Sequence, residues 1–314
     1  MTWAIWAPLL APWITVPAAR RLAALLPPRW AALLLTLATA VAGVLAGTAV
    51  ALLAADALLH LPPVAALGHL SPPLLPDGPV TLALGCAALP VGAASAWAAV
   101  RTLRRHDSRR YHAAIRGAAA GRAGDLVVLP DAKPDAFALP GRPGTVVVTS
   151  GMLGSLAPDE QAVLLAHERA HLRCRHHLLA LTADLAACLH PALRALRAPI
   201  AYQCERWADE QAAAAVGDRR LAARAVGRAA LAASATPLAR RPASVLTATA
   251  GPVPRRMSAL LAPPPSAGPL ARRAGAVVLL LLLVSATATA EAADALHDNI
   301  EVAQGPVERP RPAH

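Results

Sequence analysis

The sequence has few of the aromatic and charged residues that an ordinary soluble domain uses for its core and its surface. Aromatic residues make up 3% of the 314 residues, with a single phenylalanine, and charged residues make up 16%. Hydrophobic residues reach 56%, so the apolar content is mostly alanine, leucine and valine. This composition argues against a plain soluble protein and indicates a chain that lies partly in a membrane.

Lysine is also nearly absent: Lys133 is the only one, so arginine supplies the formal net charge of +11. The arginines cluster beside apolar runs, where orientation in a membrane explains them better than contact with nucleic acid. We therefore expect no direct nucleic-acid binding. The cysteines show neither CxxC pairing nor the spacing of a disulfide framework, and we expect reduced thiols; they are Cys86, Cys174, Cys188 and Cys204.

Four segments are apolar enough to enter or cross a bilayer, so we expect the lipid bilayer to be one of the partners of this chain. They are residues 3–16, 30–61, 80–100 and 274–290. The first is short and contains Pro8 and Pro12, so we expect a kinked span there. The others have the length that a spanning helix needs. The predicted fold is a mainly α-helical integral membrane protein with about four transmembrane helices.

Arginines mark one side of every predicted span, whereas residues 62–79 contain neither lysine nor arginine. The positive-inside rule then places the N-terminus outside and residues 101–273 in the cytoplasm. We therefore predict a membrane domain over residues 1–100, a cytoplasmic domain, a last span, and a short extracytoplasmic tail over residues 291–314. The predicted location is the plasma membrane of a bacterium, as a multi-pass protein. The arginines are Arg20, Arg21, Arg29, Arg101, Arg104, Arg105, Arg109, Arg110, Arg272 and Arg273.

Two β-branched runs bounded by Gly and Pro, Asp125–Pro130 and Thr145–Thr149, predict strands in a hairpin or a small sheet. The second run has two interpretations. Its residues Val146, Val147 and Val148 either offer a sheet edge on which an extended substrate pairs, or form a closed structural strand.

From Pro158 onward the cytoplasmic domain reads as helical. Pro158 suits the first helical position, and Asp159 and Glu160 complement the helix dipole in the first turn. Residues 178–197 are strongly apolar but contain charged residues and a proline. We expect there a buried or membrane-skimming helix that packs against the helix starting at Pro158, and not a fifth span.

The segment His167-Glu168-Arg-Ala-His171 has the HExxH pattern of zinc peptidases. Histidines four residues apart on a helix project from one face, so both can bind one zinc ion. Glu168 lies next to the first ligand, where its carboxylate can take a proton from a metal-bound water. We predict His167 and His171 as metal ligands and Glu168 as the catalytic base.

A second helical segment supplies the missing ligand. Glu205 and Asp209 are four residues apart, so they share a helix face. Glu205 can complete a His-His-Glu site for one Zn²⁺ per chain, with a fourth position open for water. Asp209 can accept a hydrogen bond from a ligating histidine and fix its tautomer.

HExxH followed by ExxxDxxA resembles the pattern of membrane gluzincins, which include the HtpX and Ste24 peptidases and the BlaR/MecR antirepressor peptidases. Asp135–Gly141 is similar to the NAFA-type segment of these families, and Leu156–His167 to their approach to the metal helix. The resemblance covers roughly residues 125–232. It implies a zincin-like α+β domain with a small sheet, an HExxH helix and an ExxxD helix.

Two departures stand out. Asp135 occupies a position where Asn is common, and residues 291–314 are too few for the penicillin-binding sensor of BlaR/MecR proteins and contain no SxxK motif. We therefore expect no β-lactam sensing. Three early spans and one late span nevertheless resemble the BlaR/MecR layout more than that of HtpX.

The expected function is that of a membrane-bound zinc endopeptidase that cleaves a cytoplasmic or membrane-proximal protein. The resemblance implies a transcriptional repressor as one substrate class. One alternative is an HtpX-like peptidase for membrane-protein quality control. The other is a non-catalytic transmembrane signalling or scaffold protein, against which the five intact site residues argue.

Two further pairs have a functional and a structural interpretation. His176 and His177 either assist zinc binding or oxyanion stabilisation, or are polar residues at a helix end. Arg219 and Arg220 either stabilise the oxyanion or are solvated or membrane-facing, and we favour the structural interpretation of both pairs.

Overall fold

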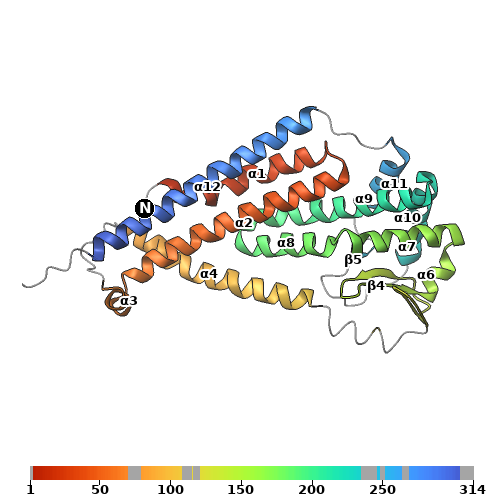
Figure 1. The fold of residues 1–314 in the computed structure, drawn as a ribbon, viewed down its shortest axis with the longest axis horizontal. Coiled ribbons are helices and arrows are strands. Elements are labelled where there is room, and N and C mark those ends of the chain that lie inside the picture. The colour runs from red at the N-terminus through yellow and green to blue at the C-terminus, as the bar shows by residue number, and fades with distance from the viewer. Residues whose placement is uncertain are drawn as a thin grey trace, which may run out of the picture.

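The computed structural model of the chain describes residues 3–69, 79–107, 115, 121–234, 246–247, 252–263 and 269–304. Long helices form a bundle at one end, and a small sheet with shorter helices forms a compact head at the other (Figure 1). Of the residues named above, Arg109 and Arg110 lie outside the described ranges.

Among the described residues, three helices are long and apolar enough to cross a membrane. They are α2 (Pro28–Leu59), most of α4 (Pro79–His106) and most of α12 (Pro269–Gln304). These helices contain three of the four predicted spans, and α12 continues well beyond residue 290. The chain is therefore a multi-pass membrane protein.

The first predicted span lies in η1 (Trp3–Ile5) and α1 (Trp6–Ala23), a helix that includes Pro12 and Pro17. It does not reach the length and hydropathy of the three long helices. Instead α1 packs against both α2 and α12, so it belongs to the bundle without being one of its candidate spans.

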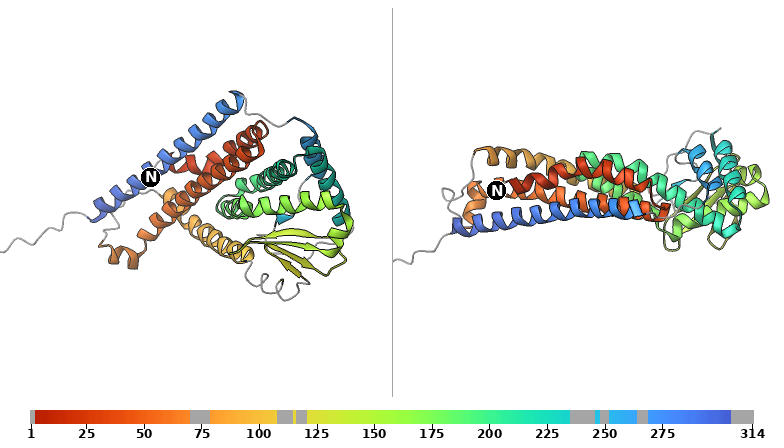
Figure 2. Two further views of the ribbon diagram at one scale, coloured as in Figure 1. Left: turned by 45° about the vertical axis from the view of Figure 1, so that its right-hand side comes forward. Right: turned by 90° about the horizontal axis from the view of Figure 1, so that it is seen from above.

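Helix α2 is the centre of the bundle, with α1 and α12 along one side and α4 along the other (Figures 1 and 2). Its contact face consists largely of alanines, seven of which are at most 5% exposed: Ala31, Ala32, Ala38, Ala42, Ala46, Ala49 and Ala57. Small side chains allow helix backbones to approach closely where no hydrophobic effect drives association. A short helix, α3 (Pro62–Leu67), follows α2 at the end far from the head.

A helical hairpin joins the bundle to the head. Helix α8 (His176–Leu189) runs out of the head along α2 and α4, η3 (Pro191–Leu196) turns the chain, and α9 (Arg197–Val216) returns. Residues of α1, α2, α8, η3, α9 and α12 share one buried apolar cluster. The predicted apolar helix of residues 178–197 is thus present as a short packed helix, and its main neighbours are α2 and α4.

The sheet has five strands in the order β1-β2-β4-β3-β5. Strand β2 (Leu126–Leu129) pairs in parallel with β4 (Thr145–Thr149), so the two predicted strands lie in a sheet and not in a hairpin. Strand β3 (Ala136–Leu139), from the NAFA-type segment, pairs antiparallel with the other side of β4. The outer strands are β1 (Gly121–Ala123) and β5 (Leu246–Thr247).

Four helices complete the head. Helix α6 (Ser150–Ser155) directly follows β4, and α7 (Pro158–Arg173) contacts β3 and β4. Helices α10 (Arg219–Ser234) and α11 (Val253–Leu261) pack against each other and against α9. The site helices α7 and α9 therefore lie between the sheet, the α10–α11 pair and the bundle.

Candidate metal centre

Helix α7 begins where its sequence predicts, at Pro158, and its first turn is firmly anchored. The carboxylate of Glu160 accepts a hydrogen bond from the backbone N–H of Ala157 at 3.0 Å. The same fully buried carboxylate accepts from Arg224 at 3.0 Å and pairs with Arg228, both on α10. These contacts fix the position of α7 relative to α10, and with it the position of the two histidines.

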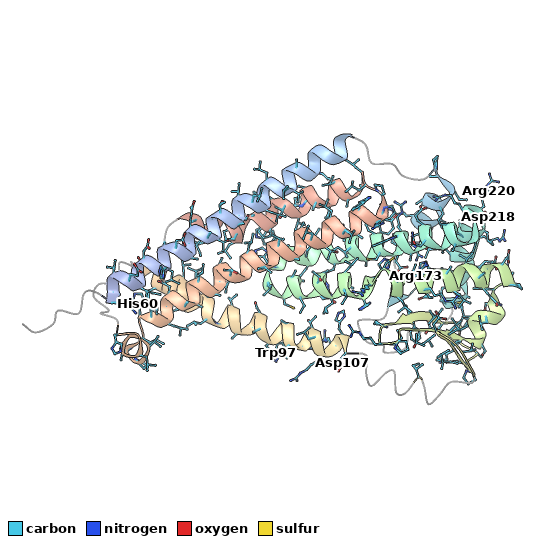
Figure 3. All side chains as sticks on the ribbon, viewed as in Figure 1. His60, Trp97, Asp107, Arg173, Asp218 and Arg220 are labelled. Atoms are coloured by element: carbon cyan, nitrogen blue, oxygen red, sulfur yellow. The ribbon has the colours of Figure 1, made fainter. Side chains whose placement is uncertain are left out.

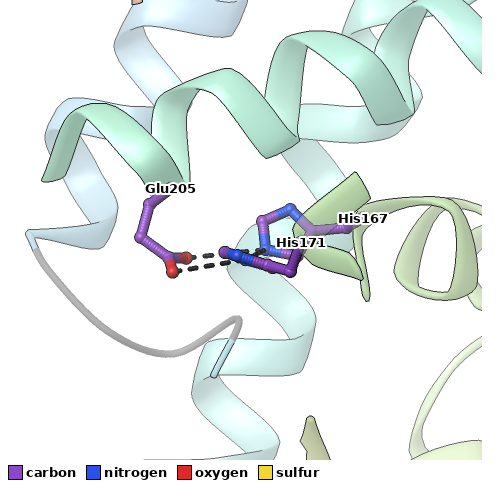
Figure 4. A group of neighbouring side chains, drawn as sticks. All are labelled: His167, His171 and Glu205. Atoms are coloured by element: carbon purple, nitrogen blue, oxygen red, sulfur yellow. Dashed lines mark hydrogen bonds and ion pairs between the residues drawn. The ribbon is translucent and has the colours of Figure 1, made fainter. Parts of the chain in front are cut away.

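His167 and His171 lie one turn apart on α7, and their rings point toward Glu205 of α9 (Figure 4). The Nε2 atoms of the two rings are 3.0 Å apart. Oε2 of Glu205 lies 3.5 Å from Nε2 of His167, and Oε1 lies 3.4 Å from Nε2 of His171. All three side chains are at most 2% exposed. The three predicted ligands thus converge on one buried point.

A zinc ion fits this group. Tetrahedral ligands at about 2.0–2.2 Å from zinc lie about 3.3–3.5 Å from one another, which is close to the separation of Glu205 from both rings. Charge leads to the same conclusion. The carboxylates of Glu168, Glu205 and Asp209 and the guanidinium of Arg256 are all at most 2% exposed and leave a net negative charge. A buried excess of carboxylates is costly unless a cation compensates it, so the His-His-Glu group is a zinc site.

Asp209 contacts His167 on the side of the ring that faces away from the other ligands. Its Oδ1 lies 3.0 Å from Nδ1 of His167, the ring nitrogen not directed at the other ligands. Burial alone would lower the pKa of His167, but Asp209 and Glu205 outweigh it and raise that pKa to about 10. The surroundings of this ring therefore favour positive charge, whether a proton or a metal ion supplies it.

Arg256 of α11 is the main contact of this centre that was not predicted from the sequence. Its Nε and Nη2 donate to the two carboxylate oxygens of Asp209 at 2.8 and 2.6 Å. Its Nη1 lies 3.0 Å from Oε2 of Glu205. The guanidinium is 1% exposed, and these carboxylates keep its pKa above the usual value despite burial. One signal was present in the sequence: Arg256 falls at helical spacing between Val253 and Leu260, on the buried face of a short helix.

His176 is also part of the centre. Arg175, between α7 and α8, has a positive φ of 53° and changes the direction of the chain there. Helix α8 therefore starts with His176 close to α7. Nδ1 of His176 lies 2.9 Å from Nδ1 of His171, and the fully buried ring packs against Trp207. Burial, followed by the nearby charge on His167, lowers the pKa of His176 to about 3. A neutral His176 can accept the Nδ1 proton of His171 and so leave its Nε2 free for metal.

The structure places the other predicted residues as follows. Glu168 is fully buried on α7, and its charge acts on Arg256. Arg219 donates to Glu210 and to the carbonyls of Ala259 and Leu260, so it ties α9, α10 and α11 together away from the ligands. Arg220 is exposed at the start of α10 (Figure 3).

The proposed substrate strand needs a correction. Val146, Val147 and Val148 are 0% exposed, and β4 is paired on both sides, with β2 and β3. No edge of β4 is left for a substrate, so the structural interpretation holds and the substrate-binding one is wrong. The sequence of this run shows no alternation of apolar and polar residues. That pattern is typical of a central strand, which is buried on both faces.

Two cysteines lie near the centre in sequence. Cys204 precedes the third ligand and is 1% exposed, and burial raises the pKa of its thiol far above the usual value. Cys174 ends α7 and is half-buried, with a pKa that burial also raises. Neither thiol has the lowered pKa of a redox-active cysteine.

Comparison with known proteins agrees with this geometry. The model of peptidase family M48 matches residues 105–198, which include both histidine ligands and Glu168 and end before Glu205. Neither a curated protein nor a solved structure matches the chain. Glu205, which lies outside the matched segment, therefore adds a third ligand to the two histidines inside it.

Proposed function

We propose that this chain, which matches the M48 peptidase model and has a buried His-His-Glu site next to membrane helices, is an endopeptidase that cleaves a cytoplasmic or membrane-proximal protein. The observation that carries the proposal is the place of the site. The metal helix α7 is continuous in the chain with α8, which packs against the candidate spans α2 and α4. A substrate held at or near the membrane surface would therefore be close to the ligands.

Each residue of the centre has a role in the proposed reaction. Zinc bound by His167, His171 and Glu205 would polarise the scissile carbonyl and acidify a water molecule. Glu168 would serve as the base that accepts a proton from this water and returns it to the leaving amine. Asp209 keeps the proton of His167 on Nδ1, so that Nε2 faces the metal.

A transcriptional repressor is one substrate class for such an enzyme, as the resemblance to BlaR/MecR peptidases suggests. The order of the helices supports this alternative: the candidate spans α2 and α4 precede the head together with α1, and a single candidate span, α12, follows it. The competing proposal is an HtpX-like peptidase that removes damaged membrane proteins. Cutting of one small soluble regulator would support the first, and cutting of many misfolded membrane proteins would support the second.

The arginine pattern supports a cytoplasmic head. Arg20 and Arg21 near the end of α1, Arg29 at the start of α2, and Arg104 and Arg105 near the end of α4 all lie at the ends of helices that face the head. We propose that the N-terminus lies outside a bacterial plasma membrane. A cysteine placed in the head should react with a membrane-impermeant maleimide only in inverted vesicles, and labelling in intact cells would contradict this topology.

The substrate can be found by comparing cells that produce the active enzyme with cells that produce Glu168→Ala. New protein N-termini that appear only with the active enzyme would mark its cleavage sites. We expect these sites in cytoplasmic proteins or in cytoplasmic segments next to a membrane helix. Sites confined to extracytoplasmic segments would contradict the proposed function.

A further inference from the structure

A basic cavity of about 520 Å³ lies where α4, α8 and the turn after β3 meet. Four of its wall residues are basic: His106, Arg142, Arg175 and His177. The other described residues of its wall are glycines, a proline and leucines, so no carboxylate is among them. None of the three zinc ligands lines this cavity, and neither the metal chemistry nor the proposed function uses it.

His106 has an unsatisfied ring nitrogen at this place. Its side chain is 5% exposed, and Nε2 is 3.0 Å from Oδ2 of Asp184, a carboxylate to which it donates. Nδ1 is buried and has no hydrogen-bond partner within the part of the chain that the structure describes. A buried polar atom without a partner is costly, and in the neutral ring Nδ1 is an acceptor. A ligand that donates a hydrogen bond, such as a hydroxyl, would satisfy this atom of the neutral ring.

The other basic residues of the cavity wall favour an anionic ligand. Arg142 and Arg175 carry fixed charges and are exposed, so their guanidinium groups are free to reach a ligand in the cavity. Burial lowers the pKa of His177, and Arg175 and His106 lower it further, as expected in positive surroundings. Helix α8 also begins here without a side-chain cap, and its first N–H groups add positive potential. Two guanidinium groups near a helix N-terminus suit a phosphate.

The membrane side of the site is apolar along α4 and charged toward the head, where Asp184, Arg105, Arg194 and Arg197 line it. A second cavity, of about 790 Å³, shares His106 with the first and lies between α4 and α8. Helix α4, a candidate span, lines it with Val91, Ala94 and Trp97, and Trp97 lies on the outer side of that helix (Figure 3). A phosphate site at the end of a spanning helix, next to an apolar groove along the same helix, has the shape and polarity of a phospholipid.

We propose that the two cavities bind one anionic glycerophospholipid with a hydroxyl in its headgroup. Arg142 and Arg175 hold the phosphate, Nδ1 of His106 accepts from the headgroup hydroxyl, and an acyl chain lies along α4. Leu172 and Arg175 of the headgroup cavity flank the turn between α7 and α8, directly after His171. Bound lipid would therefore brace the segment that carries the second zinc ligand and its partner His176.

The test uses the purified, delipidated full chain in a neutral detergent, with the thermal unfolding midpoint as readout. Phosphatidylglycerol should raise the midpoint, whereas phosphatidylcholine and inorganic phosphate should not. Phosphatidylmethanol, which is anionic but lacks the hydroxyl, should bind about fivefold more weakly than phosphatidylglycerol, as expected for one lost hydrogen bond. Stabilisation by inorganic phosphate alone would overturn the assignment to a lipid, and equal binding of the two anionic lipids would overturn the role of His106.

Matched variants locate the effect. In Arg142→Gln/Arg175→Gln, binding of phosphatidylglycerol should weaken by about fivefold for each charge removed. The control Arg173→Gln/Arg220→Gln removes two exposed arginines outside this cavity and should keep the affinity of the unaltered chain. An equal loss in both double variants would show general attraction between charges and would overturn the site. The unfolding midpoint without lipid shows directly that both variants are folded.

Discussion

At the scale of single residues, Arg256 is the group on which the balance of the buried charges depends. It pairs with Asp209 through two hydrogen bonds and also contacts Glu205, so one guanidinium compensates two of the buried carboxylates. Without zinc, Arg256 and the protonated His167 together compensate these carboxylates. With zinc bound, the metal shares that task.

Because both Arg256 and zinc compensate the buried carboxylates, the stability lost in Arg256→Leu should depend on whether zinc is bound. The zinc-free protein should lose about 3–5 kcal/mol of stability, because two buried carboxylates lose their partner. The zinc-loaded protein should lose less, since the metal still compensates Glu205. Denaturant unfolding with and without a chelator measures both losses. The control Arg255→Leu alters the exposed neighbour, which stacks on Tyr202, and should change neither form much. Equal losses in both forms of Arg256→Leu would contradict this account.

Proton competition at His167 gives a second prediction. Because its raised pKa is about 10, this ring carries a proton at neutral pH in the zinc-free protein and must release it when zinc binds. Zinc affinity should therefore rise by about tenfold per pH unit between pH 6 and 9. Calorimetry in buffers of different ionisation enthalpy should show about one proton released per zinc from this ring.

The variant Asp209→Asn tests whether Asp209 causes the raised pKa of His167. Without the carboxylate, the pKa of His167 should fall and the proton release at neutral pH should shrink. Zinc affinity or activity should fall by about 10–100-fold, because the ring also loses its hydrogen-bond acceptor. Unchanged proton release in Asp209→Asn would show that Asp209 does not control this ring.

Spacing along the chain was enough to predict four residues of the centre. His167 and His171, and likewise Glu205 and Asp209, are pairs four apart on helices, and helix geometry alone puts each pair on one face. Arg256 was not predicted, and His176 was named as a possible zinc-site residue although the structural interpretation was favoured. Arg256 reaches the site because α11 packs on α9, and His176 because Arg175 reverses the chain, and both depend on tertiary contacts.

At the scale of elements, the crossing of α2 and α4 depends on Gly85. A Cβ at this position would lie 2.6 Å from the backbone oxygen of Leu53 and 2.7 Å from Cβ of Ala57. The variant Gly85→Leu should therefore push α4 away from α2 and lower the unfolding midpoint by several degrees. Gly92→Leu, on the same helix, meets its nearest neighbour at 3.9 Å and should be tolerated. Equal midpoints in the two variants would contradict the observed crossing.

The strands show where sequence patterns mislead. Thr145–Thr149 was predicted to be a strand and is one, but composition could not reveal its neighbours. Strand β3 contains Ala136 and Ala138, which lack the β-branching of the adjacent runs, and it was not predicted as a strand. Its presence beside β4 is the reason that β4 has no free edge.

At the scale of the whole molecule, the zinc centre lies in the head, and the hairpin of α8 and α9 connects it to the bundle (Figure 2). Helix α9 carries Glu205 and Asp209 in the head while its N-terminal part packs against α2. A movement of α2 relative to the head would thus reach the third ligand directly. Hydropathy and length predicted the three long helices among four expected spans, whereas the hairpin required knowledge of packing.

The most direct test measures zinc content and peptide-bond cleavage together in the purified full chain. The unaltered protein should contain about one zinc per chain and cleave an unfolded protein substrate. Glu168→Gln should retain the zinc and lose cleavage, because the ligands remain and the base is gone. His167→Ala should lose both. Cleavage that persists in Glu168→Gln, or a zinc content that does not change in His167→Ala, would contradict the central claim.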